Sequence, residues 1–427
     1  MPTTDFFRKF CLPFAFVVLQ ILPAWAAPLS SEDSELLQKI QKDTLQYFLK
    51  QSDKNTGLTR DSSQSGSPAS IAATGFSLAA IAIGQSHGWI PEEWAREYLE
   101  KTLQTLLHRA EHHNGFFYHF LDARSGKRIW TSEASSIDTA ILVAGALVAA
   151  QYFPGTEIEK MAWAIYERVD WPWMMNGRLL LCMGWLPETG FLPYYWDTYN
   201  EHLLLQALAL GSPTHPVPEE AWNEWARRED VYNGKKIVYS HSGSLFTYQF
   251  PHAFIDFRGL KDNDIDYFEN SKKASLANRE YSLSFRSEHK SYSENSWGLS
   301  ASLGPGGYKA YGGKPGIGLQ DGTIAPYAAL SSMVFTPEES LAAVRFFYRN
   351  YTQNLYGNFG FKDAFNLDKK WWSQEYLGID QGISLLMLEN FLNEGAVWKK
   401  FMRLEPVKRW IKLCGLNHQM LEAGGER

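Results

Sequence analysis

Three segments of the chain combine aromatic residues and carboxylic acids at a regular spacing. They are residues 130–138 (Trp-Thr-Ser-Glu-Ala-Ser-Ser-Ile-Asp), 195–201 (Tyr-Trp-Asp-Thr-Tyr-Asn-Glu) and 371–380 (Trp-Trp-Ser-Gln-Glu-Tyr-Leu-Gly-Ile-Asp). In each, a second acid follows the first after four or five residues, and an apolar stretch comes next. Two carboxyl groups can cleave a glycosidic bond, one as the acid that protonates the leaving oxygen and the other as nucleophile or as base on water. Indole rings offer flat apolar faces to sugars.

The same acids also have an ordinary structural explanation. A carboxylate at the start of a helix caps backbone N–H groups, and Asp138 and Asp380 fit that role. The helix dipole lowers the pKa of such a group, whereas a general acid needs a raised pKa. Glu201 is the better candidate acid, because it lies just inside an apolar run and has Asp197 as a like-charged neighbour one turn earlier.

Two kinds of helix alternate along the chain and would position these acids. Amphipathic helices are predicted at 31–50, 91–111, 156–169, 218–229 and 337–351, and three of these segments begin with Pro-Glu-Glu, a helix-start signal. Helices that are apolar nearly all round, and so must be covered on all sides, are predicted at 72–84, 137–150, 200–211, 323–334 and 382–392. With further helices at 267–284 and 406–413, about twelve helices result. We predict an all-α fold, an (α/α)6 toroid, rather than an open solenoid of helix pairs.

Short strand-like pieces interrupt the helices. We expect hairpins or loops at 115–120, 178–185 with 191–196, 236–239 and 357–361, and a glycine-rich loop at 304–322. The inner helices of a toroid all run in one direction, so their N-termini gather at one end. The three acid-rich segments should therefore meet around one cavity mouth, with the hairpins and long loops at that end.

The two ends of the chain differ from its middle. Arg8 and Lys9, an apolar run and Ala24-Trp25-Ala26 predict a signal peptide at residues 1–26, with an N-terminal membrane anchor as the alternative. A single domain is expected at 27–415 and a polar tail at 416–427. The chain is then exported to the periplasm or secreted, and has no membrane association after cleavage.

Charge and cysteine content exclude several classes of protein. The formal charge is −6 and becomes −7 without the signal peptide, which disfavours nucleic acid and anionic polysaccharide as partners. We expect a monomer that acts on a neutral saccharide. Cys182 and Cys414 remain in the mature chain, too few for a disulfide framework, and we expect both to be reduced.

Other motifs in the sequence give little support for a serine hydrolase, a metal site or a phosphate-binding loop. Residues 84–88 match Gly-x-Ser-x-Gly but lie at a helix end, not at a strand-to-helix turn. His108 and His112 have helical spacing but no third metal ligand. The glycine-rich loop has no phosphate-binding Gly-Lys-Ser/Thr. No metal site and no cofactor are predicted.

Taken together, longer motifs resemble the glycoamylase-like domain family over nearly the whole mature chain. These motifs occupy residues 199–215, 241–246, 250–252, 255–259, 295–299, 321–326, 360–366 and 378–382. The resemblance implies an (α/α)6 barrel, and characterised relatives include bacterial endo-β-1,2-glucanases and the related domain of cyclic β-1,2-glucan synthases. It therefore implies a β-1,2-glucan-cleaving enzyme, with Glu201 and Asp138 as leading catalytic candidates. Ser244 stands where many relatives have Pro, and Ser300 where they have Thr, which bears on substrate preference.

The candidate site combines both lines of reasoning. The catalytic candidates are Glu201, Asp138 and Asp380. The candidate substrate-binding residues are Asp61, Trp130, Glu133, Trp196, Asp197, Tyr199, His252, Arg258, Trp297 and Trp372. A transglycosylase on the same glucan, a polysaccharide lyase and a non-catalytic glucan-binding protein stay open as alternatives, although the acidic charge argues against a lyase.

Overall fold

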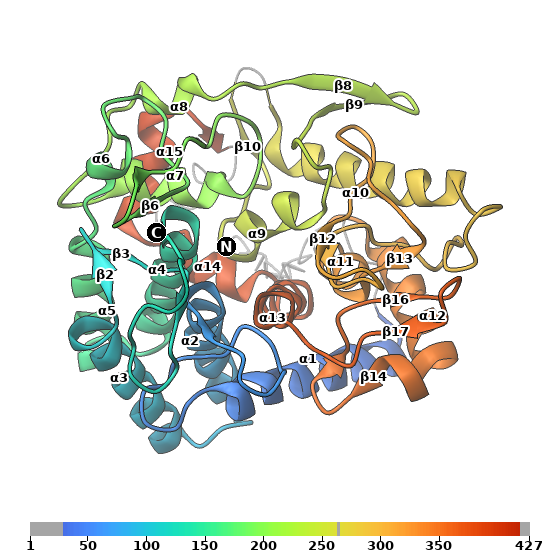
Figure 1. The fold of residues 1–427 in the computed structure, drawn as a ribbon, viewed down its shortest axis with the longest axis horizontal. Helices are drawn as coiled ribbons and strands as arrows, with labels where there is room; N and C mark the ends of the chain where they lie inside the picture. The colour runs from blue at the N-terminus through green and yellow to red at the C-terminus, as the bar shows by residue number, and fades with distance from the viewer. Residues whose placement is uncertain (1–28, 263–264, 419–427) are drawn as a thin grey trace, which may run out of the picture.

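The computed structural model describes residues 29–262 and 265–418, and its long helices form an inner and an outer set (Figure 1). The predicted signal peptide and most of the predicted tail lie outside these residues. The inner helices are α2 (Ile71–Ser86), α4 (Ser136–Tyr152), α7 (His202–Gly211), α9 (Phe246–Phe254), α11 (Pro326–Ser331) and α13 (Gly378–Leu392). The outer helices are α1 (Ser31–Gln51), α3 (Glu92–His108), α5 (Glu157–Glu167), α10 (Tyr267–Ser284), α12 (Pro337–Leu355) and α15 (Glu405–Leu413). The ring closes where α13 packs against α2, which confirms the predicted (α/α)6 toroid.

Composition explains why each helix is inside or outside. All residues of α7 are buried, and α2 and α4 are buried along nearly their whole length. Two of the inner helices approach closely because glycines face each other: a Cβ on Gly145 would lie 1.9 Å from the carbonyl oxygen of Gly75. The outer helices bury one face only, as the amphipathic pattern predicts.

One predicted helix differs from the structure, and one observed helix was not predicted. The segment predicted as an outer helix at 218–229 contains only the short helix α8 (Ala221–Glu224), followed by a hairpin of β8 (Glu229–Tyr232) and β9 (Lys235–Val238). Its outer place is taken by α15, which packs on α7. The sixth inner helix, α9, was not predicted, because it is short and contains Pro251.

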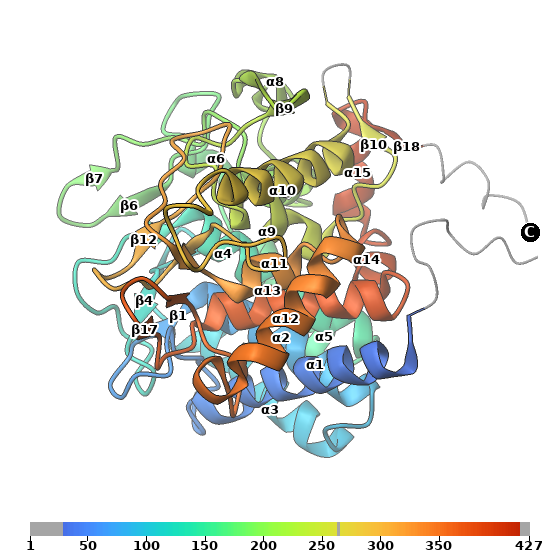
Figure 2. The same ribbon diagram turned by 90° about the vertical axis from the view of Figure 1, so that its right-hand side faces the viewer.

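Short strands fix the N-terminal ends of several inner helices. β1 (Ala69–Ser70) leads into α2 and pairs with β4 (Phe120–Leu121). β5 (Ala134–Ser135) leads into α4 and pairs with β6 (Gly184–Leu186), which pairs with β7 (Gly190–Phe191). β13 (Thr323–Ile324) precedes α11 and pairs with β16 (Phe365–Asn366). β16 also pairs with β17 (Trp371–Trp372). Most of these strands lie at one end of the barrel, on the left in Figure 2.

The remaining short elements complete the fold. The helices are α6 (Trp171–Met174) and α14 (Ala396–Phe401). The hairpins are β2 (His112–His113) with β3 (Phe116–Phe117), β11 (Ala301–Ser302) with β12 (Lys309–Ala310), and β14 (Tyr356–Gly357) with β15 (Gly360–Phe361). β10 (Leu260–Lys261) pairs with β18 (Asn417–His418). Among the described residues, no helix is long and apolar enough to cross a membrane. Cys182 and Cys414 are free, as predicted.

Candidate active site

A cavity of about 640 Å³ opens at the end of the barrel where the inner helices begin. Its lining comes from the first turns of α4 and α13, the start of α7 and α9, and the connections that precede α2 and α4. The titratable residues that line it are Asp61, His119, Asp138, Glu201, Tyr308 and Glu375. All three acid-rich segments thus contribute directly, through Asp138, Glu201 and Glu375.

A second cavity of about 730 Å³ continues on the other side of Glu201. Glu201 and Phe246 line both cavities, so the two form one cleft with Glu201 at the junction. The second part is lined by the acid-rich segment around Trp196 and Asp197, together with polar and aromatic side chains such as Arg178 and Tyr194. A saccharide chain lying along this cleft would have sugar rings on both sides of Glu201.

Glu201 occupies the position just before α7. Burial raises its pKa from 4.5 to about 7, and the nearby carboxyl group of Asp138 acts in the same direction. Its backbone carbonyl accepts a hydrogen bond from the N–H of Leu204 at 3.3 Å, so the residue forms part of the helix start. A carboxyl group that holds its proton close to neutral pH can act as a general acid.

Asp138 lies in the first turn of α4 and is held there by a reciprocal cap. The Ser135 hydroxyl donates to its carboxylate at 2.5 Å, and its own N–H donates to the Ser135 hydroxyl at 3.3 Å. The Nδ1 atom of His119 lies 3.7 Å from the same carboxylate oxygen and 3.1 Å from Oε1 of Glu133. Asp138 is therefore both a helix cap and part of an ion-pair network in the cleft wall.

His119 is the centre of this network. Burial lowers the pKa of an imidazole, but here the carboxylates of Asp138, Glu133 and Asp61 outweigh burial and raise it to about 9. Burial raises the pKa of Glu133, but the hydrogen bond from His119 prevails and lowers it. The imidazole ring also stacks on Phe120, with ring centroids 3.9 Å apart.

The potential ligand atoms of His119, Glu133 and Asp138 lie within 4.8 Å of one another, close enough to hold a cation. The raised pKa of His119 instead makes the imidazolium the cation of the cluster at neutral pH. We therefore interpret these three residues as an ion-pair network.

Asp380 lies in the first turn of α13, beneath the cavity surface, and is 2% exposed. Burial and the neighbouring carboxyl group of Asp363 hold its pKa well above the ordinary value. Burial raises the pKa of Asp363 to about 6, although Oδ2 of Asp363 accepts a 2.6 Å hydrogen bond from the N–H of Leu303. One oxygen of each carboxyl, Asp363 Oδ1 and Asp380 Oδ2, has no hydrogen-bond partner among the described residues. Two such buried carboxyls can share one proton, as like charges in a low-dielectric site do.

Asp61 reaches the cavity from the connection between α1 and α2. Its carbonyl accepts a 2.7 Å hydrogen bond from the N–H of Gly378, which joins this connection to the start of α13. Burial raises the pKa of Asp61 to about 6, and Asp138 and Glu375 add to that effect while His119 opposes it.

Aromatic side chains face the cleft at three places. Trp130 is 68% exposed and has a left-handed backbone, with φ of 55°. Such strain for a bulky residue is uncommon away from functional sites. Trp196 is largely buried and donates from Nε1 to the Ser136 hydroxyl at 2.9 Å. Tyr308 follows a glycine-rich turn; the residue is 55% exposed, yet burial around its hydroxyl and the Asp380 carboxyl raise its pKa.

Four predicted substrate-binding residues do not lie in the cleft. Tyr199, His252 and Trp297 have no exposed surface and pack in the core. The Tyr199 and His252 side chains both contact the Ser271 hydroxyl, at 3.2 and 2.9 Å. Arg258 follows the C-terminus of α9, at the opposite end of the barrel, where it pairs with Asp256 at 2.7 Å and lies over the Trp398 ring. Three of these residues therefore belong to the core and Arg258 to the other end of the barrel, so none of the four lines the cleft.

Trp372 and Glu133 are not among the residues that line the cleft. Trp372 is half-buried and stacks on Phe365, with ring centroids 5.2 Å apart, and it is not among the cleft-lining residues. Glu133 also does not line the cavity, but it contacts His119, which does. Asp61, Trp130, Trp196 and Asp197 line the cleft as their predicted roles require, and their contact with substrate stays a prediction.

Sequence reasoning missed His119, Asp363, Tyr308 and Glu375 as members of the site. His119 lies in a segment predicted only as strand, and the β1–β4 ladder brings it to the cleft. Asp363 stands within a family motif, but nothing in the local sequence shows that it contacts Asp380. Tyr308 lies in the glycine-rich loop, where no residue periodicity indicates which way its side chain points. Glu375 belongs to an acid-rich segment, and only its partner Asp380 was chosen.

The described fold and cleft place the chain in the class of (α/α)6 barrels with a carboxylate-lined site at the N-terminal ends of the inner helices. The sequence profile of the family described as "Putative glucoamylase" matches residues 193–405. A structure described as a "putative glucoamylase" from Bacteroides uniformis is 32% identical, covers 92% of this chain and 99% of its own, and superposes with a TM-score of 0.85. The chain therefore belongs to the glycoamylase family.

Two further relatives have named activities. The endo-β-1,2-glucanase of Chitinophaga pinensis, in complex with sophorotriose and glucose, is 31% identical, with coverage of 91% of this chain and 98% of its own and a TM-score of 0.84. An exo-β-1,2-glucooligosaccharide sophorohydrolase (non-reducing end) from Parabacteroides distasonis is 28% identical over 420 residues, 89% of this chain. The match covers 58% of that relative's length.

Proposed function

We propose that the protein is a glycoside hydrolase that cleaves β-1,2-linked glucan. The observation that carries the proposal is the position of Glu201, at the junction of the two parts of the cleft and with a pKa raised to about 7. The linkage rests on the relatives that act on β-1,2-glucan and β-1,2-glucooligosaccharides. The predicted signal peptide supports export to the periplasm or secretion as part of the same proposal.

Glu201 acts as the general acid. At neutral pH its raised pKa keeps a large share of the molecules protonated, and the proton passes to the glycosidic oxygen as the bond from that oxygen to the anomeric carbon breaks. Glu201 separates the two cavities. The sugar that leaves with the protonated oxygen therefore lies in one cavity, and the sugar whose anomeric carbon is attacked lies in the other. Trp130 and Tyr308 on one side and Tyr194 on the other are exposed aromatic rings available to stack on sugar rings.

Asp380 is the better-placed second carboxyl group. The Asp138 carboxylate already accepts a hydrogen bond from the Ser135 hydroxyl and lies 3.7 Å from Nδ1 of His119, so we assign it a binding role. Burial and the neighbouring Asp363 carboxyl group hold the pKa of Asp380 well above its ordinary value, so this pair has a raised proton affinity. Its chain neighbour Ile379 lines the cavity, and in this proposal Asp380 accepts the proton of an attacking water rather than bonding to the sugar itself. Asp138, His119 and Asp61 then bind and orient sugar hydroxyl groups.

A transglycosylase would use the same residues and differ only in whether water or a sugar hydroxyl accepts the glycosyl unit. Product analysis separates the two, because transfer yields chains longer than the substrate and hydrolysis does not.

The proposal is tested with Glu201→Gln. We expect kcat on linear β-1,2-glucan to fall by about 10²–10⁴-fold with folding retained, because the amide cannot donate an acidic proton. Activity of the unmodified protein should fall as the pH rises through about 7, where Glu201 loses its proton, and this alkaline limb should be absent from the residual activity of the variant. Glu224→Gln, an exposed change on α8, serves as the control. Full activity of Glu201→Gln, or equal activity on β-1,3-glucan and starch, contradicts the proposal.

A further inference from the structure

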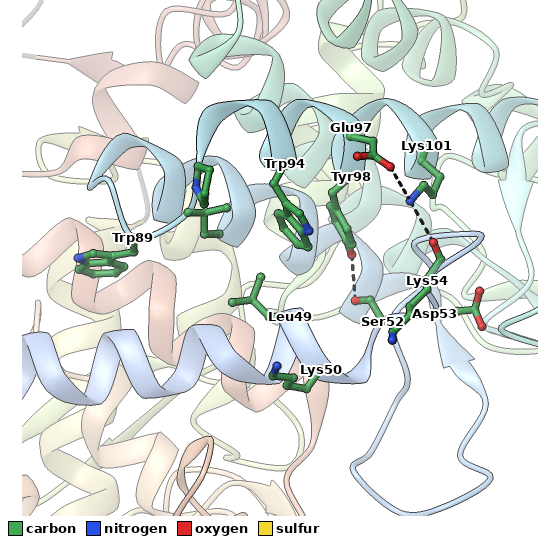
Figure 3. A pocket seen from close by; sticks show the side chains of 12 residues that line it. Leu49, Lys50, Ser52, Asp53, Lys54, Trp89, Trp94, Glu97, Tyr98 and Lys101 are labelled. Atoms are coloured by element: carbon green, nitrogen blue, oxygen red, sulfur yellow. Dashed lines mark hydrogen bonds and ion pairs between the residues drawn. The ribbon is translucent and has the colours of Figure 1, made fainter.

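A third cavity, of about 510 Å³, lies on the outer wall of the barrel between α1 and α3 (Figure 3). Its volume is within the roughly 300–1,000 Å³ typical of ligand sites. The apolar part of its lining consists of Leu49 at the end of α1, Trp89, Ile90 and Pro91 in the connection before α3, and Trp94 and Tyr98 on α3. None of these residues belongs to the catalytic cleft.

The aromatic rings of this pocket are held by their neighbours. Trp94 is 39% exposed and stacks on Tyr98, with ring centroids 5.4 Å apart and planes at 14°. Trp89 stacks on His87, with centroids 4.5 Å apart and planes at 19°. One face of each indole is thus covered by another ring, and Trp94 keeps 39% of its surface exposed for contact with a ligand. A ligand ring would meet surfaces that need no rearrangement, so little conformational entropy is lost on binding.

The pocket base is also rigid. The Tyr98 hydroxyl contacts the Ser52 hydroxyl at 2.9 Å, the Gly57 carbonyl at 3.0 Å and the Ser77 hydroxyl at 2.8 Å. Figure 3 shows Trp94 and Tyr98 side by side on α3, directed toward α1. The aromatic platform therefore has a fixed orientation relative to both helices.

Polar side chains of both signs surround the platform. Lys101 donates to the Lys54 carbonyl at 3.0 Å and lies 3.6 Å from Glu97, and Lys50, Lys54 and Asp53 complete the rim. Such a rim offers hydrogen-bond donors and acceptors around flat apolar rings. That combination matches a neutral sugar, whose ring face is apolar and whose edge carries hydroxyl groups.

We propose that this pocket is a second binding site for the glucan chain that the catalytic cleft cleaves. The inference rests on the proposed function for the identity of the sugar. One connection joins the two sites, because residues 52–54 line the pocket while Asp61 and its neighbours up to Pro68 line the cleft. A polymer bound at the outer site raises the effective concentration of its other segments at the cleft, whereas an oligosaccharide too short to reach both sites gains nothing.

The test compares Trp94→Ala and Trp89→Ala with Trp163→Ala. Trp163 is a half-exposed indole on outer helix α5. It packs beside the Tyr166 ring, with ring centroids 5.9 Å apart, and lines neither the pocket nor the cleft, so it is a matched control. Substrates are long linear β-1,2-glucan and a β-1,2-linked trisaccharide. In the two pocket variants we expect KM for the long chain to rise by about tenfold and kcat for the long chain to stay unchanged. Both kcat and KM for the trisaccharide should also stay unchanged. Unchanged KM for the long chain, or an equal rise in the control, overturns the second site.

A binding measurement separates this inference from the catalytic proposal. Migration of the Glu201→Gln protein, with and without Trp94→Ala, is followed in native gels that contain long β-1,2-glucan, at low and high salt. We expect retardation that Trp94→Ala weakens and that salt leaves unchanged. Such retardation supports the second site even if the unmodified protein cleaves no glucan, in which case only the catalytic proposal fails. Retardation that Trp94→Ala does not alter, or that high salt abolishes, contradicts a neutral-sugar site here.

Discussion

Asp138 and Asp380 occupy equivalent positions in two inner helices but have opposite surroundings. Each is the third residue of its helix and follows an isoleucine, in Ser136-Ile137-Asp138 and Gly378-Ile379-Asp380. The Asp138 carboxylate accepts a hydrogen bond from Ser135 and lies 3.7 Å from the imidazole of His119, whose pKa is raised to about 9. Asp380 has no side-chain cap at its helix start and is buried beside the carboxyl group of Asp363.

This difference shows what decides the charge of an acid at a helix start. The dipole of the helix favours the ionised form in both cases. For Asp380 that effect is outweighed by burial and by a like charge, which together raise the pKa. The neighbours come from residues distant in sequence, His119 in one case and Asp363 in the other, so tertiary structure gives the two aspartates different electrostatic surroundings.

The largest expected effect compares the two aspartates directly. Asp380→Asn should lower kcat by about 10²–10⁴-fold, because the amide cannot accept the proton of the attacking water. Asp138→Asn should mainly raise KM, because this group orients sugar hydroxyls in the proposed mechanism. Steady-state kinetics on linear β-1,2-glucan measures both. The reverse pattern, a loss of kcat in Asp138→Asn with kcat of Asp380→Asn preserved, would transfer the catalytic role to Asp138.

The ion pairs that His119 forms beside Asp138 should make the stability of the fold depend on pH. The pKa of His119 is raised from 6.5 to about 9, so its ion pairs stabilise the fold fully below pH 6.5 and this stabilisation is lost as the pH rises through 9. The shift corresponds to about 3 kcal/mol, an upper value for a side chain that retains some exposure. We expect the free energy of unfolding of the unmodified protein to exceed that of His119→Gln below pH 6.5 and the gap to narrow by pH 9. Urea unfolding at both pH values measures this, and a gap that is independent of pH refutes the ion-pair interpretation.

The surroundings of Asp380 should appear in the pH dependence of activity, with a smaller effect. Asp363→Asn removes the like charge that raises the pKa of Asp380, so the acidic limb of the kcat profile should move to lower pH by about one unit. Asp368→Asn, in the same segment but paired with His289, is the control and should leave the limb in place. A limb that does not move in Asp363→Asn means that the group titrating there is not Asp380.

Much of the fold could be predicted, because apolar residues at helical spacing report directly on burial. The inner helices α2, α4, α7 and α13 were found within a few residues, and α10 at its observed bounds. The helix α9 was missed because Pro251 and a run of aromatic residues gave no clear helical pattern. The segment at 218–229 starts like a helix, but only four of its residues are helical, and α15 packs on α7 in its place.

The candidate site was predicted in part for a related reason. Acids at inner-helix starts could be located because helix order fixes the end of the barrel to which they belong. Tyr199, His252 and Trp297 lie in the core and not in the cleft, because aromatic residues in a motif fill the core as readily as they line a cleft. His119 and Asp363 were missed, because a pairing between distant segments leaves no local pattern.

By itself, the sequence determined the alternation of apolar and amphipathic helices, and with it the toroid and the end of the barrel where the carboxyl groups gather. Helix periodicity is a local property, so it can be read from neighbouring residues. Only the tertiary structure decided which carboxyl group keeps its proton, since a pKa depends on burial and on charges within a few ångströms, and those are supplied here by segments far apart in the chain.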